Sequence, residues 1–227
     1  RLKNSRKRIL TMIEILFENE DFLACIKPVG VPSQCDGAED AIKLLKEQTG
    51  DEIYPVHRLD TAVGGTMIFA KNKKTAAYLS KEIAEKRFAK AYFAVTEGVP
   101  EEKEGRLEDL LFKDKRKNKS YVVKRERKGV RRASLDYRVL DEADGKALVC
   151  VMLNTGRSHQ IRVQFASRKM PLVGDGKYGS RDNGCEVALW SHKVEFEFDG
   201  NSVSFKSIPN IGEYPWNLFK IWRKYGC

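Results

Sequence analysis

Apolar and polar residues alternate over several short stretches of the chain, and this pattern predicts strands. Six of these stretches form three pairs joined by polar or turn-forming residues, as in β-hairpins: 13–17 with 22–26, 134–140 with 147–153, and 194–198 with 203–205. The second pair is joined by Asp144-Gly145, a strong signal for a tight hairpin turn. Two further apolar runs, residues 66–70 and 91–96, predict buried strands.

Four other segments are predicted helices: 39–48, 74–87, 159–167 and 216–225. Gly50 follows the first as a typical C-terminal stop, and Asn72 precedes the second as an N-terminal cap. Because strands outnumber helices and hairpins dominate, we expect an α+β fold. Its core would be a large mixed, mostly antiparallel sheet with helices packed on it.

The length of 227 residues fits one large domain or two small ones, and 41% hydrophobic residues suffice for a sizeable core. We expect a basic N-terminal arm over residues 1–12 and one folded domain over residues 13–227. Residues 113–132 have no clear apolar period over their first half. We therefore interpret this segment as a mobile basic insertion.

Positive charge is concentrated in short segments. The chain has 42 Lys+Arg and 32 Asp+Glu, a net charge of +10. Residues 113–132 hold eleven basic residues against two acidic ones, and residues 1–8 hold five basic residues, so the remainder is net acidic. Such a distribution favours a polyanion partner, and Tyr121 within the larger segment is able to stack on a base. The alternative is a solvated charged loop without a partner.

Several classes of protein are disfavoured by composition. No apolar run approaches the roughly 20 residues that a membrane-spanning helix needs, and no segment resembles a secretory signal. The five cysteines are odd in number and form no CxxC pair, which is typical of free thiols in a reducing cytoplasm. The three histidines lie far apart, which argues against a zinc site. We expect a cytoplasmic monomer without a bound metal.

Candidate chemistry is densest at His57-Arg58-Leu59-Asp60, which is followed by Val63-Gly64-Gly65. Charged groups are costly near a core unless they are paired and used, and the glycine pair allows backbone or ligand to approach closely. We interpret Asp60 as a catalytic carboxylate. The alternative is an ordinary surface salt bridge at a strand end.

Three further motifs carry polar side chains. In residues 156–162, His159 and Arg162 share one helical face and present donors, although a phosphate-binding helix start would have the same pattern. Residues 173–179 place an aspartate and a tyrosine among three glycines, which indicates a tightly held loop or a plain turn. In residues 90–95 the alternation puts Tyr92 opposite Phe93, where a half-buried strand aromatic is the simpler interpretation.

Taken in order, these motifs resemble the RluA family of RNA pseudouridine synthases over residues 13–209. The matching segments are Lys27-Pro28-Val29-Gly30, His57–Asp60, Lys90–Ala94, Gly156–Arg162 and Gly174–Gly179. The sequence departs from the family pattern at Ser158, which replaces Thr, at residues 63–65, which replace Thr-Ser-Gly, and at Gln164, which replaces His. We expect the catalytic domain without the small RNA-binding domain that often precedes it in this family.

The resemblance implies a pseudouridine-synthase-like fold with a central RNA-binding cleft, and isomerisation of uridine in RNA to pseudouridine. Asp60 would be the nucleophile, with attack at the ribose or at the base left open. Arg162 would pair with Asp60, and Arg58 would fill the space that the uridine leaves. Tyr92 would stack on the flipped uracil, with assistance in proton removal left open. The reaction involves no redox change and no water, so no metal or cofactor is required.

The expected partner is a stem-loop of ribosomal or transfer RNA. The residues expected to bind it are His57, Arg58, Arg157, His159, Gln160, Lys115, Arg116, Lys117, Lys119 and Tyr121. Two other functions stay open on the residues alone. One is a non-catalytic RNA-binding protein that uses the same basic surfaces. The other is a hydrolase that uses Asp60 with Asp175 as the second carboxylate.

Overall fold

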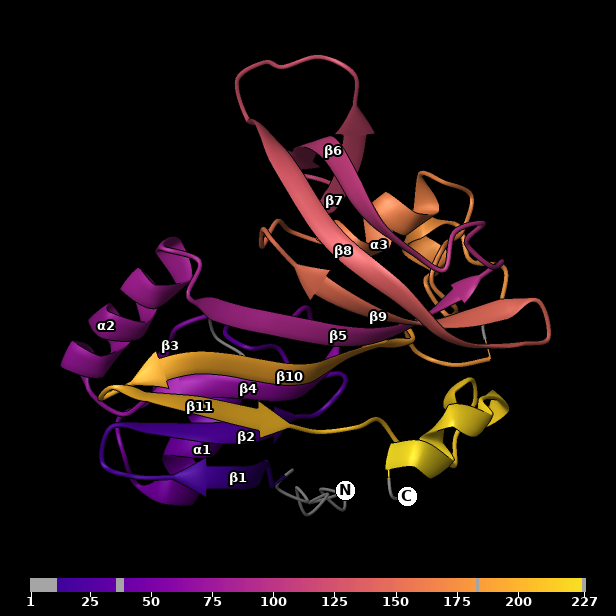
Figure 1. Ribbon diagram of the computed structural model, residues 1–227. Helices are drawn as coiled ribbons and strands as arrows, with labels where there is room; N and C mark the ends of the chain where they lie inside the picture. Colours follow the sequence, from indigo (N-terminus) through magenta and orange to yellow (C-terminus); the bar gives the residue numbers. More distant parts are fainter. Residues whose placement is uncertain (1–11, 36–38, 183, 226–227) are drawn as a thin grey trace, which may run out of the picture.

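The computed structural model describes residues 12–35, 39–182 and 184–225. The N-terminal arm expected over residues 1–12 therefore lies almost entirely outside the described residues. Eleven strands in the described part of the chain form one sheet (Figure 1). They are β1 (Glu14–Glu18), β2 (Phe22–Lys27), β3 (Tyr54–Pro55), β4 (Gly64–Ala70), β5 (Phe88–Glu97), β6 (Glu104–Asp114), β7 (Lys119–Val123), β8 (Val130–Ala143), β9 (Lys146–Leu153), β10 (Leu189–Phe198) and β11 (Asn201–Lys206).

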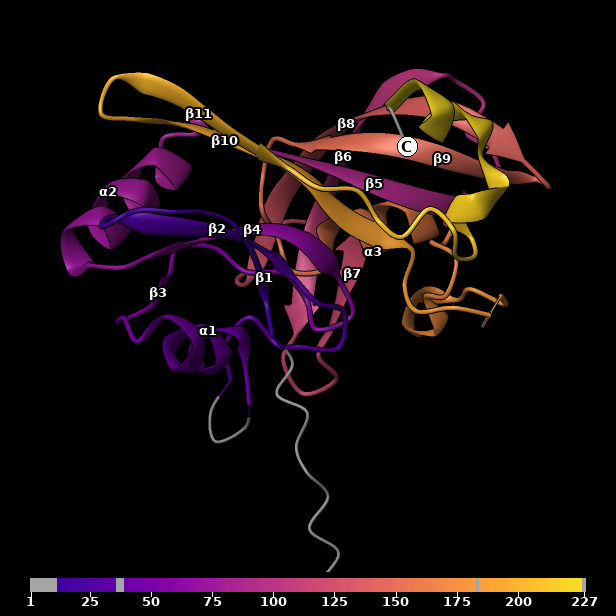
Figure 2. The ribbon, with the colours of Figure 1, turned by 90° about the horizontal axis from the view of Figure 1, so that it is seen from below.

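The strand order along the sheet is β1-β2-β4-β10-β5-β9-β8-β6-β7, with β11 paired to β10 and β3 paired to β4. Among the described strands, β4 and β10 are the single parallel pair, and the others run antiparallel. Figures 1 and 2 show β5 passing from the half of the sheet with β4 and β10 to the half with β9 and β8. The predicted α+β class with a mixed, mostly antiparallel sheet is confirmed.

The helices are α1 (Ala41–Thr49), α2 (Lys73–Ala84) and α3 (Gln160–Ala166), with short 3₁₀ helices η1 (Gly176–Tyr178), η2 (Trp216–Leu218) and η3 (Lys220–Tyr225). Successive residues of a strand point to opposite faces of the sheet. Accordingly Tyr92 belongs to the core cluster that includes residues of α1 and α3, whereas Phe93 packs with Trp216 and Trp222 on the other face. The face that carries Tyr92 is therefore the face that α1 and α3 cover.

Local signals in the sequence were followed closely by the structure. Asn72 caps α2, because its side-chain oxygen accepts a hydrogen bond from the amide of Thr75 at 2.8 Å. Gly50 ends α1 with φ of 79°, in the left-handed region that glycine adopts most easily. Asp144 and Gly145 both have positive φ, as the predicted tight hairpin turn requires.

Residues 113–132 need a correction, because they belong to the sheet rather than to an insertion outside it. They include the end of β6, all of β7 and the start of β8, and β7 is the edge strand paired with β6. Leu111 of β6 and Val122 of β7 pack against Val163 and Tyr178. Lysine-rich edge strands are common because charge opposes edge-to-edge pairing, and here the lysines concealed the strand pattern. We call residues 113–119, the turn between β6 and β7 with its first flanking residues, the basic hairpin tip.

The C-terminal segment also differs from the prediction. Residues 216–225 form two 3₁₀ helices, not one α-helix. Trp216, Phe219 and Trp222 are three residues apart and all pack into one cluster, which is the period of a 3₁₀ helix. Within the described residues, no helix combines the length and the apolar character needed to cross a membrane.

Candidate active site

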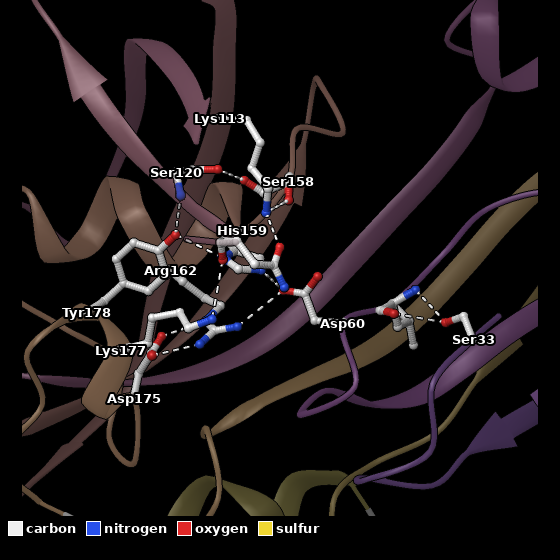
Figure 3. A network of polar contacts seen from close by, with 12 residues as sticks. Ser33, Asp60, Lys113, Ser120, Ser158, His159, Arg162, Asp175, Lys177 and Tyr178 are labelled. Carbon is white, nitrogen blue, oxygen red and sulfur yellow. Dashed lines mark hydrogen bonds and ion pairs between the residues drawn. The ribbon is translucent and has the colours of Figure 1, made fainter. Parts of the chain in front are cut away.

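Asp60 lies in the loop between β3 and β4, and three hydrogen bonds hold this loop in place. The hydroxyl of Ser33 accepts a hydrogen bond from the amide of Leu59 and donates one to its carbonyl oxygen, both at 2.9 Å (Figure 3). The amide of Gly30 donates to the carbonyl of Thr61 at 2.8 Å. The loop after β2 and the loop that carries Asp60 are thus joined into one unit. The buried side chain of Leu59 anchors that unit in the core.

The glycine pair after Asp60 is required by the sheet. Gly65 has φ of 116°, and a Cβ atom there would lie 2.3 Å from the carbonyl oxygen of Ser191. A Cβ atom on Gly64 would lie 2.6 Å from the ring of Trp190. These close approaches permit the parallel pairing of β4 with β10. The sequence pattern left open whether a backbone or a ligand approaches the glycine pair. In the structure the backbone of Ser191 and the ring of Trp190 do so.

Arg162 of α3 stands between two carboxylates (Figure 3). Its Nε and Nη2 donate to the two oxygens of Asp175 at 2.6 and 2.7 Å, and its Nη1 donates to Oδ2 of Asp60 at 3.3 Å. Burial alone would lower the pKa of Arg162, but the hydrogen bonds and charges of Asp175 and Asp60 outweigh it, and its pKa is raised. The predicted Asp60–Arg162 pair is present. Asp175 holds the arginine more tightly than Asp60 does.

Asp175 is a site residue whose part the sequence did not reveal. It is 1% exposed, and both of its oxygens are bound by Arg162. A carboxylate held in a bidentate ion pair is a positioning group rather than a free acid, so this geometry does not favour the hydrolase alternative. In the sequence, Asp175 stands out only as a carboxylate among glycines. The sequence does not show that its partner is Arg162.

His159 and Tyr178 form a second pair beside Asp60. Nδ1 of His159 is 2.9 Å from the Tyr178 hydroxyl, and Nε2 is 3.7 Å from Oδ2 of Asp60. Burial lowers the pKa of His159 to about 4 against the opposing charge of Asp60, with Arg162 contributing in the same direction as burial. The imidazole is therefore neutral at physiological pH. Its φ of 53° turns the chain sharply into α3.

Tyr92 reaches the site from β5. Its side chain is 5% exposed, on the sheet face that α1 and α3 cover. Burial raises the pKa of Tyr92, the charge of Asp60 raises it further, and a hydrogen bond with Ser191 partly offsets this. The hydroxyl therefore keeps its proton at neutral pH. Asp60 thus contacts Arg162 at 3.3 Å and contributes to the raised pKa of Tyr92.

Lys27 is a buried cation within electrostatic reach of Asp60. In the sequence it stands out only as the first residue of the motif Lys27-Pro28-Val29-Gly30. Its side chain has no exposed surface, and its ammonium donates to the carbonyls of Pro28 and Val31 at 2.7 and 2.6 Å. Burial lowers the pKa of Lys27 to about 8, while Cys25 and Asp60 act in the opposite direction. The lysine thereby fixes the loop that adjoins the Asp60 loop.

The basic hairpin tip lies against the site. Lys113 donates to the Ser158 hydroxyl at 2.9 Å, and Lys119 donates to the carbonyl of Lys177 at 2.5 Å. Burial lowers the pKa of Lys113, and the charge of Asp60 opposes this shift, which places the ammonium within electrostatic reach of the carboxylate. Lys113 was not among the expected RNA-binding residues. By contrast, the three basic residues of the turn itself, Lys115, Arg116 and Lys117, are exposed.

Two of the expected RNA-binding residues, His57 and Gln160, make contacts within the protein. Nε2 of His57 accepts a hydrogen bond from the amide of Ile68 at 3.0 Å, and its ring lies 5.4 Å from that of Phe88. Gln160 is buried and binds the amide of Arg157 and the carbonyl of Ser134, both at 3.0 Å.

Other expected RNA-binding residues remain at the surface. Arg157 is exposed, and its Nε donates to the carbonyl of Arg132 at 3.0 Å. Arg58 is exposed as well, and it lies within electrostatic reach of Lys113. Tyr121 is partly exposed, and the ammonium of Lys119 lies 5.8 Å from its ring centroid.

Comparison with known proteins identifies the family to which the chain belongs. The sequence pattern of RNA pseudouridylate synthases matches residues 21–167. The chain is 31% identical over 217 residues to the ribosomal large subunit pseudouridine synthase D of Borreliella burgdorferi, covering 89% of this chain and 65% of that protein. It is 30% identical over 202 residues to the dual-specificity RNA pseudouridine synthase RluA of Vibrio parahaemolyticus, covering 80% of this chain and 74% of that protein.

A solved structure shows the same fold. The human RNA pseudouridylate synthase domain containing 1 superposes with a TM-score of 0.78 at 22% identity, over 91% of this chain and 87% of that one. The chain therefore belongs to the RNA pseudouridylate synthase family, a family of isomerases. The resemblance found from the sequence motifs is confirmed.

Proposed function

We propose that this protein isomerises specific uridines in structured RNA to pseudouridine, with Asp60 as the nucleophile. The observation that carries the proposal is the asymmetry of the Asp60 carboxylate. Oδ2 faces Arg162 at 3.3 Å and His159 at 3.7 Å. Among the described residues, no hydrogen-bond partner contacts Oδ1. One oxygen is thus held by the protein while the other is free to attack.

The isomerisation breaks two bonds and forms two. The bond between N1 of uracil and C1′ of ribose breaks, the base turns, and C5 becomes bonded to C1′. The proton on C5 then leaves and N1 takes up a proton, so no proton is gained or lost overall. Attack by Oδ1 at C1′ or at the base would give a covalent intermediate. Arg162 orients Asp60 for this attack, because its Nη1 donates to Oδ2 at 3.3 Å. Atoms and electrons balance without an oxidant, a reductant or water.

Tyr92 supports the base during this rearrangement. Its ring lies on the sheet face that α1 and α3 cover, within electrostatic reach of Asp60, and we assign it to stack on an extruded uracil. Because its pKa is raised, the phenol is protonated at neutral pH and is able to donate a hydrogen bond but not to accept the C5 proton. We therefore assign stacking and hydrogen-bond donation to Tyr92, rather than proton removal.

The substrate is an RNA with exposed phosphates around the target. Arg58 and the basic hairpin tip lie around the site and are suited to phosphate contacts, which provide affinity without sequence preference. Relatives bear names that specify either the ribosomal large subunit or tRNA. Both RNA classes are therefore substrates to test, and we place the reaction in the cytoplasm.

The test is pseudouridine formation in unmodified ribosomal and transfer RNA, measured by nucleoside mass spectrometry. We expect the wild-type protein to form pseudouridine and Asp60→Asn to lose at least about a thousandfold in rate while still binding RNA. The matched control is Asp199→Asn, an exposed hairpin-turn aspartate with φ of 50°, a conformation that asparagine tolerates. Substantial turnover by Asp60→Asn would refute the nucleophile assignment.

A further inference from the structure

We propose that Tyr178 and His159 form a hydrogen-bond relay that runs from the backbone of β7 to Asp60 and positions its carboxylate for attack. The inference rests on the proposed function of Asp60 and adds two positioning residues to it. It also connects the basic hairpin tip to the nucleophile. The relay has three contacts, shown in Figure 3: Ser120 to Tyr178, Tyr178 to His159, and His159 to Asp60.

The direction of each hydrogen bond follows from counting protons. The amide of Ser120 has one proton and donates it to the Tyr178 hydroxyl oxygen at 2.8 Å. Burial raises the pKa of Tyr178, so the hydroxyl keeps its own proton. The other partners of that hydroxyl are Nδ1 of His159 at 2.9 Å and the side chain of Ser120. The Ser120 hydroxyl donates its own proton to the carbonyl of Ser158 at 2.6 Å, and we assign the proton of Tyr178 to the bond with His159, in which Nδ1 accepts.

The tautomer of His159 follows from that step. A neutral imidazole has one protonated nitrogen and one acceptor nitrogen. Because Nδ1 accepts from Tyr178, the proton is on Nε2, and Nε2 faces Oδ2 of Asp60 at 3.7 Å. Tyr178 thus orients an N–H group toward the nucleophile. The charged groups around this imidazole are Asp60, Arg162, Lys113 and Lys177.

The contact between His159 and Asp60, at 3.7 Å, is longer than a hydrogen bond. The contacts of Tyr178 with Ser120 and with His159, at 2.8 and 2.9 Å, are within hydrogen-bond distance. Hydrogen bonds of catalytic groups are often long before substrate binds and shorten in the complex. The hairpin strand is attached to the same unit, since Ser120 donates to the carbonyl of Ser158 at 2.6 Å and Lys119 contacts the carbonyl of Lys177. RNA bound to the basic hairpin tip would shift the residues of the relay. Shortening of the distance between Nε2 of His159 and Oδ2 of Asp60 to a hydrogen bond would then fix Oδ2 and leave Oδ1 to attack.

A purely structural role for the pair predicts different results. The Tyr178 ring lies edge-on to His159 with centroids 5.7 Å apart, and the Arg162 guanidinium lies 5.3 Å from its centre. If only this packing mattered, removal of one hydroxyl would leave the catalytic rate unchanged. Two measurements therefore distinguish the relay from a purely structural role. They are the position of the proton on the His159 imidazole and the single-turnover rate at saturating RNA.

Two substitutions of His159 test the relay. The amide nitrogen of glutamine takes the position of Nε2 and is able to donate to Asp60, whereas that of asparagine takes the position of Nδ1 and does not reach it. We expect His159→Asn to lower the single-turnover rate at saturating RNA by about 10- to 100-fold, and His159→Gln to recover most of that loss. Backbone strain would give the opposite order, because asparagine tolerates the positive φ of residue 159 better.

The hydroxyl of Tyr178 is tested by Tyr178→Phe, with Tyr54→Phe of β3 as a control outside the site. We expect a loss of about tenfold in the single-turnover rate with RNA affinity unchanged. In a His159→Asn background, Tyr178→Phe should cost nothing more, because the relay is already broken. Losses that multiply in the double variant, or an equal loss for His159→Gln and His159→Asn, would overturn the proposal.

The tautomer is measured without turnover. Long-range ¹H–¹⁵N spectra distinguish the two imidazole tautomers, and the chain has only three histidines to assign. We expect the Nε2–H form for His159 in the wild type and a mixture in Tyr178→Phe. An Nδ1–H form in a wild-type enzyme that makes pseudouridine would overturn the relay alone. Absence of pseudouridine from every RNA, with the Nε2–H form present, would instead refute the proposed function.

Discussion

Arg162 is held more closely by Asp175 than by Asp60, at 2.6 Å against 3.3 Å. The buried carboxylate neutralises and orients the arginine, and the arginine then presents Nη1 to the carboxylate that we assign to the reaction. Removal of Asp175 would leave the arginine buried with one weak partner. In our proposal Asp175 does not contact the substrate. The contribution of its ion pair with Arg162 to stability can therefore be measured by substituting Asp175.

We predict that Asp175→Asn destabilises the protein by about 3 kcal/mol, because breaking a buried ion pair leaves an uncompensated charge. The matched control is Asp136→Asn, which breaks the bidentate pair between Arg106 and Asp136 on the exposed sheet surface. That loss should stay below about 1 kcal/mol. Urea denaturation measures both variants, and equal losses would show that burial does not govern the Asp175 contact.

The role of the Tyr92 hydroxyl is separated from that of its ring by Tyr92→Phe. If the hydroxyl transfers a proton during the reaction, turnover at saturating RNA should fall by roughly a hundredfold or more. If Tyr92 only stacks, turnover should stay close to that of the wild type. Because the raised pKa of Tyr92 argues against proton transfer, we expect a loss well below a hundredfold, of the size that one hydrogen bond gives. Single-turnover measurements under saturating RNA decide between the two.

The exposed turn of the basic hairpin tip should act through phosphate contacts. Replacing Lys115, Arg116 and Lys117 with Ser should weaken binding of every RNA and reduce the slope of log affinity against log salt by roughly 2 to 3 units. Lys119 is left in place because it contacts the carbonyl of Lys177 and the ring of Tyr178.

Replacing Lys73, Lys74 and Lys81 of α2 with Ser gives the same change in net charge at a distance from this hairpin. Binding titrations over a range of salt compare the two triple variants. A similar slope change in both would mean that total charge, rather than the hairpin tip, attracts the RNA.

Acid should destabilise the folded protein through His159. Its pKa is about 4 in the folded state and near 6.5 in the unfolded chain, so the unfolded state binds the proton first. The contribution of His159 to stability is therefore present above pH 6.5 and is lost as pH falls toward 4. His159→Gln should flatten this part of the stability curve. Urea midpoints at pH 7.5, 6 and 5 measure the difference, and an unchanged slope would contradict the shifted pKa.

The sequence by itself determined most of the local structure and the identity of the central site residues. Asn72, Gly50 and the Asp144-Gly145 turn act through hydrogen bonds and backbone angles within a few residues, so their effect is visible in the sequence. The candidates Asp60 and Arg162 also followed from their motifs. Their meeting across 102 positions was an implication of the family resemblance, which the structure bears out.

Tertiary structure alone decided which partners the polar groups chose. Arg162 forms its shortest ion pair with Asp175, and Tyr178 forms a hydrogen bond with His159. His57 accepts a hydrogen bond from the backbone amide of Ile68. It also decided that the lysine-rich segment forms an edge strand, because its apolar residues find their partners on α3 and η1. A side chain's partner depends on loop conformation and strand register, which are set by the packing of the whole sheet. The periodicity of a short segment contains no information about either.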